Sequence, residues 1–272
     1  MPDDKNKVKR IEKREEYWNK NYANYWINRV DEANSEDISS SKIIKDDTKT
    51  SKNAIYSDAI SLLDITKTDN VIEIGVGFGR SLPELCQAAL HVTALDISAP
   101  MITLAKDRTK EKNISFYVSP SEEMPFDSNV FDVAVCFASF DAMYQTEALI
   151  EINRICKKGA RVLITGKNDN YFDNDNLAME AEIGARKKGH PNYFTDVRKL
   201  LNNINKFGFR IDIQKFYLKR GDFGLADVQT KMTSKFYEFL IVLCKVSQCS
   251  VGADFLISSD VSKTYNRNFS RS

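Results

Sequence analysis

Clustered metal ligands, paired cysteines and long apolar runs are all missing from this sequence of 272 residues. Its two histidines and five cysteines form no CxxC pair and no cluster, so neither a disulfide framework nor a structural zinc site is expected. The longest strictly apolar run, Phe239 to Cys244, is far shorter than the ~18 residues of a membrane-spanning helix. The N-terminus is too highly charged for a signal peptide. We therefore expect a cytoplasmic protein with reduced thiols and no membrane anchor.

An excess of charge of either sign is also missing. The chain carries 39 Lys and Arg against 38 Asp and Glu, a formal net charge of +1. Such a balance argues against the broad basic surface that nucleic-acid binding requires, so the expected partner is a small molecule. The length suffices for a sizeable core in one α/β domain, and nothing in the sequence indicates an oligomeric state.

The pattern of apolar and polar residues divides the chain into three parts. Residues 1–53 are predicted to form a helical cap followed by a polar linker. Residues 54–249 are predicted to form an α/β domain, and the Ser-rich residues 250–272 a C-terminal tail. The domain thus accounts for most of the chain.

The cap carries aromatic residues at spacings of three and four, which places them on one helical face. Two interpretations stay open. The face either packs permanently on the back of the domain or closes as a lid over a binding crevice. In the second case Tyr22, Tyr25 and Arg29 would lie near the bound ligand.

Short apolar runs alternate with helix-like segments beyond residue 54, a pattern that predicts parallel strands buried on both faces. The predicted strands are 71–74, 92–96, 114–118, 131–137, 161–165, 209–217 and 236–245. The predicted helices are 54–64, 80–90, 99–110, 145–157, 176–188 and 195–206.

The segment VIEIGVGFGR, residues 71–80, predicts a ligand-binding turn between the first strand and its helix. Gly75, Gly77 and Gly79 allow positive φ angles and let backbone amides approach a ligand without a Cβ in the way. A dinucleotide fingerprint would need glycine in place of Arg80, and the G-K-[S/T] of a P-loop is missing. The turn is therefore neither a dinucleotide-binding turn nor a P-loop.

Asp96 ends the second predicted strand, 21 residues after Gly75. The carboxyl ends of neighbouring parallel strands open on one crevice, so Asp96 is expected to face the glycine turn. There its carboxylate can accept hydrogen bonds from both hydroxyls of a ribose. The alternative is a helix N-cap, a role that Ser98 fills equally well.

With these residues the sequence resembles the class I S-adenosylmethionine-dependent methyltransferases, especially their small-molecule branch. The segments 119–140, 148–166 and 192–211 resemble further stretches of that family in the same order. The resemblance implies a Rossmann-like, doubly wound sheet of seven strands, six of them parallel and the last antiparallel. It also implies S-adenosylmethionine as the cofactor.

The resemblance assigns cofactor-binding roles along the strand ends. Glu73 and the three glycines would hold the methionine part, and Asp96 the ribose. The contact of Arg29 with the carboxylate is instead an expectation of the lid interpretation. The remaining predicted contacts are Ile97 and Met101 on the adenine, the Ser121 amide at the adenine ring, and the Cys136 carbonyl on the methionine amino group. The family often carries Gly-Asp-Ala where Ser119-Pro120-Ser121 stands here, so the Asp contact with the adenine amine is lost or moves to Ser121 or Glu122.

The methyl acceptor is expected beside the turn after the fourth strand and the polar insertion 166–194. Asp141 and His190 are the candidate bases for a hydroxyl or amine acceptor. Asp141, Asp169 and Asn170 resemble a magnesium site of catechol-type O-methyltransferases, but their spacing from the strands fits it poorly, so no metal is assigned.

The sequence thus predicts methyl transfer to an oxygen or nitrogen of a small polar metabolite or sugar. It lacks the Asn/Asp-Pro-Pro-Tyr and Pro-Cys signatures of other acceptor classes. The alternative is a non-catalytic subunit of methyltransferase fold that acts as a partner or regulator.

Overall fold

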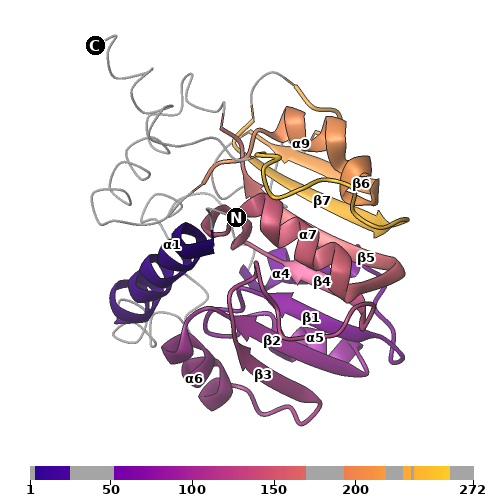
Figure 1. The fold of residues 1–272 in the computed structure, drawn as a ribbon. Coiled ribbons are helices and arrows are strands. Elements are labelled where there is room, and N and C mark those ends of the chain that lie inside the picture. The colour runs from indigo at the N-terminus through magenta and orange to yellow at the C-terminus, as the bar shows by residue number, and fades with distance from the viewer. Residues whose placement is uncertain (1–3, 25–51, 170–192, 219–228, 234–235, 258–272) are drawn as a thin grey trace.

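A computed structural model describes residues 4–24, 52–169, 193–218, 229–233 and 236–257, which form one seven-stranded sheet with helices on both faces (Figure 1). The strands are β1 (Asn70–Ile74), β2 (His91–Asp96), β3 (Ile114–Val118), β4 (Phe131–Cys136), β5 (Cys156–Lys167), β6 (Phe209–Tyr217) and β7 (Glu238–Lys245). The helices are α1 (Asp4–Tyr17), α4 (Lys52–Ser61), α5 (Leu82–Ala88), α6 (Ala99–Arg108), α7 (Gln145–Ile155) and α9 (Val197–Asn203). Three shorter turns complete the helical elements: the π-helix η1 (Trp18–Tyr22) and the 3₁₀-helices η2 (Phe140–Ala142) and η3 (Ile204–Phe207).

The strand order is β3-β2-β1-β4-β5-β7-β6. Every neighbouring pair from β3 to β5 is parallel, whereas β7 runs antiparallel to both β5 and β6. The predicted sheet, with six parallel strands and the last one antiparallel, is therefore confirmed.

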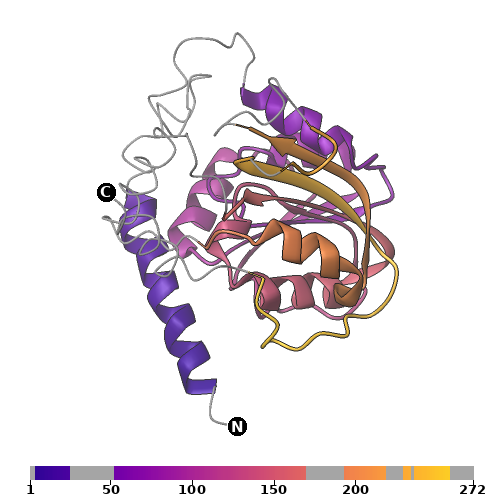
Figure 2. The ribbon, with the colours of Figure 1, turned by 90° about the horizontal axis from the view of Figure 1, so that it is seen from above.

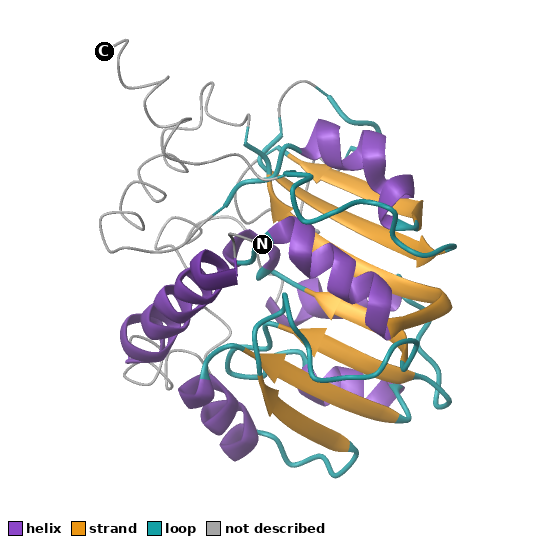
Figure 3. Ribbon diagram, in the orientation of Figure 1, coloured by secondary structure: helices purple, strands orange, loops and turns teal. Residues whose placement is uncertain are grey.

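Helices cover both faces of the sheet (Figures 2 and 3). Alternate residues of the central strands enter two separate cores, one on each face. Ile72 and Ile74 of β1 lie in the core that includes residues of α7 and α9, whereas Val71, which precedes them, lies in the core that includes residues of α4 and α5. Both faces are covered, which explains why these strands are mostly apolar and do not alternate regularly with polar residues.

The strand that departs most from its predicted bounds is β5, which begins at Cys156 instead of residue 161. The predicted strand begins later because Lys157, Lys158 and Gly159 are not apolar. In the structure Gly159 has a φ of +85°. The backbone nevertheless pairs with β4 from Cys156 onward, across an irregularity in register. The predicted helix 176–188 lies outside the described residues.

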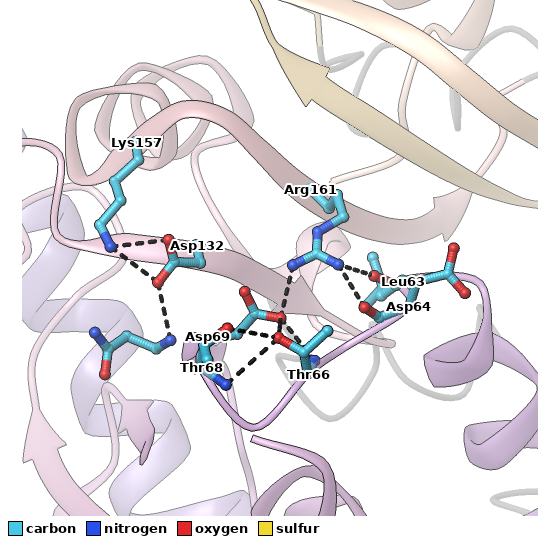
Figure 4. A network of polar contacts seen from close by, with 9 residues as sticks. Leu63, Asp64, Thr66, Thr68, Asp69, Asp132, Lys157 and Arg161 are labelled. Atoms are coloured by element: carbon cyan, nitrogen blue, oxygen red, sulfur yellow. Dashed lines mark hydrogen bonds and ion pairs between the residues drawn. The ribbon is translucent and has the colours of Figure 1, made fainter. Parts of the chain in front are cut away.

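A polar network ties the amino-terminal ends of the central strands together (Figure 4). Arg161 of β5 donates to the carbonyls of Leu63 and Asp64 at 2.6 Å each and to Asp69 Oδ2 at 2.8 Å. Beside it, Lys157 Nζ contacts both oxygens of Asp132 at 2.8 and 2.9 Å. The network thereby fastens the loop before β1 to β4 and β5.

The N-terminal helix α1 lies on the opposite edge, where the parallel strands end (Figures 1 and 2). Beyond α1, the Trp18 carbonyl accepts a hydrogen bond from Ser98 at 3.3 Å, and Ala23 packs against Met101. The described part of the N-terminal segment therefore contacts the edge that is predicted to bind the cofactor, and not the back of the domain. Tyr25 and Arg29 lie outside the described residues. Nowhere in the described ranges is a helix both long and apolar enough to cross a membrane.

Asp69→Asn is expected to lower the free energy of unfolding by about 1–2 kcal/mol at pH 7. Burial alone would raise the pKa of Asp69, but hydrogen bonds from Thr66 and Arg161 lower it below its usual value. A carboxylate whose pKa is lowered on folding stabilises the folded state at pH values above its unfolded pKa of about 4. This stabilisation is lost as the pH falls through the pKa of the folded state. Urea unfolding from pH 3 to 7 tests this. The deficit of Asp69→Asn should vanish at the acid end, and the exposed Asp64→Asn should match the wild type throughout.

Candidate cofactor and acceptor site

The sheet changes its direction of winding between β1 and β4, which are neighbours although β2 and β3 come between them in the sequence. The loops after β1 and β4 leave in opposite directions at such a switch point, which opens a crevice at the carboxyl ends of the strands. The glycine turn, Asp96 and the turn after β4 all lie at this edge. It is the position that doubly wound sheets use for ligands.

The glycine turn after β1 has the backbone that its sequence predicts. Gly75, Gly77 and Gly79 have φ angles of +77°, +55° and +81°, a region that strongly favours glycine. A Cβ on Gly75 would lie 2.5 Å from the Cβ of Ser139, whereas a Cβ on Gly77 would meet nothing closer than Met101 Cε at 3.9 Å. Gly75 is therefore required for packing, and Gly77 leaves its surroundings open.

Asp96 joins the second strand to this turn. Its Oδ2 accepts a hydrogen bond from the Gly77 amide and its Oδ1 one from the Ser98 amide, both at 2.9 Å. The N-cap of α6 is Ser98, whose hydroxyl accepts from the Met101 amide at 3.4 Å. Asp96 thus lies beside the glycine turn, as the sequence predicts, and the capping role falls to Ser98.

Glu73 is a buried carboxylate with an incomplete set of partners. The Ser81 hydroxyl donates to Oε1, while Oε2 is buried and has no hydrogen-bond partner among the described residues. Burial, with a smaller contribution from the charge of Asp96, raises the pKa of Glu73 to about 8. An unpartnered acceptor beside the carboxylate of Asp96 fits a ligand that brings positive charge and an N–H donor. S-Adenosylmethionine carries a positive sulfonium and an ammonium group that can donate.

The other predicted cofactor contacts lie at the same edge with different exposures. Met101, Ser121 and Cys136 are buried, and Ile97 is half-buried. Burial raises the pKa of the Cys136 thiol to about 12, so this side chain stays neutral. Their contacts with the cofactor stay predictions, as does that of Arg29.

Glu122 is held by protein donors from two segments. Arg14 of α1 donates to its two oxygens at 2.6 and 2.5 Å, and the Tyr144 amide donates to Oε1 at 2.6 Å. Burial would lower the pKa of Arg14, but the charge and hydrogen bonds of Glu122 raise it above its usual value, so the guanidinium stays charged. The predicted contact between Glu122 and the adenine amine therefore competes with this ion pair.

Asp141 bridges the loops after β4 and β5 on the acceptor side. Its Oδ1 accepts from the Lys167 amide at 2.9 Å, and its carbonyl accepts from the Tyr193 amide at 2.6 Å. The other candidate base, His190, lies outside the described residues. The carboxylate of Asp141 thus has a positioning role whether or not it also acts as a base.

Within the part of the chain that the structure describes, no group of three acidic, His or Cys side chains could hold a metal ion. Asn170 lies outside that part. Asp169 follows β5, and burial together with the charge of Asp196 raises the pKa of Asp169 to about 6. A carboxyl group with that pKa titrates close to neutral pH.

Two tyrosines of the acceptor side were not predicted as site residues. The rings of Tyr144 and Tyr193 lie 5.3 Å apart and their hydroxyls 3.5 Å apart, while the Arg14 guanidinium lies 4.7 Å from the centre of the Tyr144 ring. The YQT and NYF segments that contain them follow no motif that marks such a pair. Their proximity depends on the fold.

Comparisons with known proteins agree with this geometry. Residues 72–164 match the family model described as a methyltransferase domain. A ubiquinone/menaquinone biosynthesis C-methyltransferase of Pseudomonas paraeruginosa is 29% identical over 113 residues, which cover 39% of this chain and 44% of the relative. A phosphatidylethanolamine N-methyltransferase of Cereibacter sphaeroides is 30% identical over 116 residues, covering 41% and 55% of the two chains. The chain thus spans about half the length of these curated relatives.

A solved structure supports the fold. Phosphoethanolamine N-methyltransferase 2 of Haemonchus contortus, in complex with phosphomonomethylethanolamine and S-adenosylhomocysteine, superposes with a TM-score of 0.56 at 16% identity. The alignment covers 71% of this chain and 52% of that one. The predicted resemblance to the class I S-adenosylmethionine-dependent methyltransferases is therefore confirmed in both sequence and fold, and the cofactor of that family is S-adenosylmethionine.

Binding of S-adenosylmethionine is expected to release a proton from Glu73. The pKa of about 8 leaves this carboxyl group largely protonated at pH 7, and the positive charges of the ligand favour its ionised form. Affinity should therefore rise as the pH increases from 6 to about 8 and then level off. Calorimetry at pH 7 in two buffers of different ionisation enthalpy counts the protons released.

The Glu73→Gln variant removes the titrating group. We expect it to release fewer protons than the wild type and to show a flatter dependence of affinity on pH. Glu123→Gln, an exposed neighbour of the site, serves as the control. Equal proton counts in the wild type and Glu73→Gln would contradict the assignment.

Proposed function

We propose that this protein is an S-adenosylmethionine-dependent methyltransferase. The observation that carries the proposal is the turn Gly75–Gly79 with Asp96 hydrogen-bonded to its Gly77 amide and Glu73 left with an unpartnered buried oxygen. Backbone amides, a ribose-binding carboxylate and an acceptor for positive donors meet at one switch point. This combination suits a ligand that contains both a nucleoside and an amino acid.

The cofactor supplies a methyl group on a positively charged sulfur, which makes that carbon the electrophile. The chain's residues are proposed to act by alignment, since in-line displacement depends on placing the acceptor atom opposite the leaving sulfur. Asp96 orients the ribose, and Glu73 neutralises positive charge at the methionine end. Asp141 fixes the turn after β4 against the end of β5, so that the acceptor side keeps its position relative to the methyl group.

The acceptor is proposed to be a small polar metabolite or sugar, methylated on oxygen or nitrogen. The paired hydroxyls of Tyr144 and Tyr193 support this, because they offer hydrogen bonds to a polar molecule at the carboxyl edge of the sheet. Asp169, with its pKa raised to about 6, supplies a second polar group after β5. One named relative is a C-methyltransferase and another a phosphatidylethanolamine N-methyltransferase. The proposal that oxygen or nitrogen is methylated here therefore depends on the site alone.

Asp96→Ala is expected to weaken S-adenosylmethionine binding at least about tenfold, since charge-assisted hydrogen bonds to two hydroxyls are lost. Calorimetric titration measures the effect, with the exposed Asp107→Ala on α6 as the matched control. NAD should not compete, because the turn lacks the third glycine of the dinucleotide pattern. NAD binding of comparable strength would refute the assignment.

Gly77→Val is expected to abolish cofactor binding while the fold persists. The branched side chain would occupy the space where backbone amides meet the ligand, and a φ of +55° is unfavourable for valine. Circular dichroism checks the fold and calorimetry the binding. Unchanged affinity in a folded variant would show that the ligand does not contact this turn.

The acceptor is open to a direct search by thermal-shift screening of metabolites in the presence of S-adenosylhomocysteine, followed by mass spectrometry of reaction mixtures. A compound that raises the melting temperature and gains 14 mass units identifies the substrate class. Cofactor binding without turnover of any candidate would instead favour a non-catalytic subunit of this fold.

A further inference from the structure

The described N-terminal segment contacts three parts of the candidate cofactor site, although it precedes the domain in sequence. Trp18 accepts from Ser98, two residues after Asp96, and Ala23 is fully buried against Met101. Phe78 of the glycine turn packs against the same pair. The segment therefore covers the side of the crevice at which the nucleoside is proposed to bind.

Arg14 anchors α1 to the domain through an ion pair. It is only 4% exposed, whereas its neighbours Glu12 and Lys13 are exposed. Its bidentate ion pair with Glu122 and its bond to the Ala142 carbonyl at 3.2 Å join α1 to the loops after β3 and β4. A buried, bidentate arginine–carboxylate pair fixes orientation as well as distance.

The π-helical turn η1 carries an unsatisfied polar atom. Asn19 Oδ1 is buried and has no hydrogen-bond partner among the described residues. A buried acceptor without a donor is costly, and π-helical turns are frequent at functional sites. A ligand that brings an N–H donor to this position would satisfy it.

We propose that residues 14–23 form a wall of the cofactor site, in which Asn19 accepts a hydrogen bond from the adenine amino group and the Arg14–Glu122 ion pair holds the wall closed. The inference rests on the proposed binding of S-adenosylmethionine. The family often has an Asp that contacts the adenine amine in the loop after β3. This chain has Pro120 there, whose ring offers no acceptor, and Asn19 would take over the contact.

Two ligands test the role of Asn19: S-adenosylhomocysteine and its purine analogue without the 6-amino group. The wild type is expected to bind the amino form at least tenfold more tightly, and Asn19→Leu should reduce this ratio at least fivefold. Asn19→Asp keeps an acceptor and should preserve the preference, as should the exposed Asn24→Leu. An unchanged ratio in Asn19→Leu overturns the proposal, whereas failure of the wild type to bind either ligand refutes the proposed function itself.

The ion pair is tested with the double variant Arg14→Met/Glu122→Gln, which removes both charges and so leaves no buried charge unpaired. The dissociation rate of S-adenosylhomocysteine, measured by surface plasmon resonance, should rise at least tenfold, and that of the exposed Lys13→Met should not change. Hydrogen exchange of the wild type is an independent measurement. The amides of α1 and η1 should exchange more slowly with the ligand bound, and either an unchanged rate in the folded double variant or unchanged exchange overturns the proposal.

Discussion

The contact between Gly75 and Ser139 is the constraint on which the candidate site depends. A Cβ at Gly75 would lie 2.5 Å from that of Ser139, so the turns after β1 and β4 pack against each other with no space for a side chain. Ser139 also donates to the Ile74 carbonyl at 2.8 Å, and Ala138 before it has a φ of +54°. This close packing fixes the two turns against each other at the switch point, where the cofactor and the acceptor are proposed to bind.

Three acidic side chains near this contact have different partners and therefore different tasks. Asp96 is satisfied by backbone amides, Glu122 by an arginine, and Glu73 only in part. Burial without full compensation is what raises the pKa of Glu73 to about 8. The carboxylate with the fewest protein partners is the one best placed to respond to a charged ligand.

The positions of most strands and the place of Asp96 beside the glycine turn follow from local patterns in the sequence, whereas the arrangement of the seven strands was predicted from the family resemblance. The strands Ile114–Val118 and Phe209–Tyr217 have the predicted bounds, and Asp96 lies beside the glycine turn as expected. Arg14 was not predicted, because its helix is charged throughout and its partner Glu122 is 108 residues away. Such long-range pairs depend on packing that no local spacing encodes, and the same holds for Tyr144 and Tyr193.

The polar network of Arg161, Asp69 and Asp132 lies at the amino-terminal ends of the strands, and the candidate site lies at the carboxyl-terminal ends (Figure 4). The residues that hold the sheet together are thus separate from those that face a ligand. We therefore expect substitutions in the loops after β4 and β5 to cost less stability than substitutions in the network. For evolution, such a scaffold allows the binding loops to change in small steps, each of which leaves a folded protein.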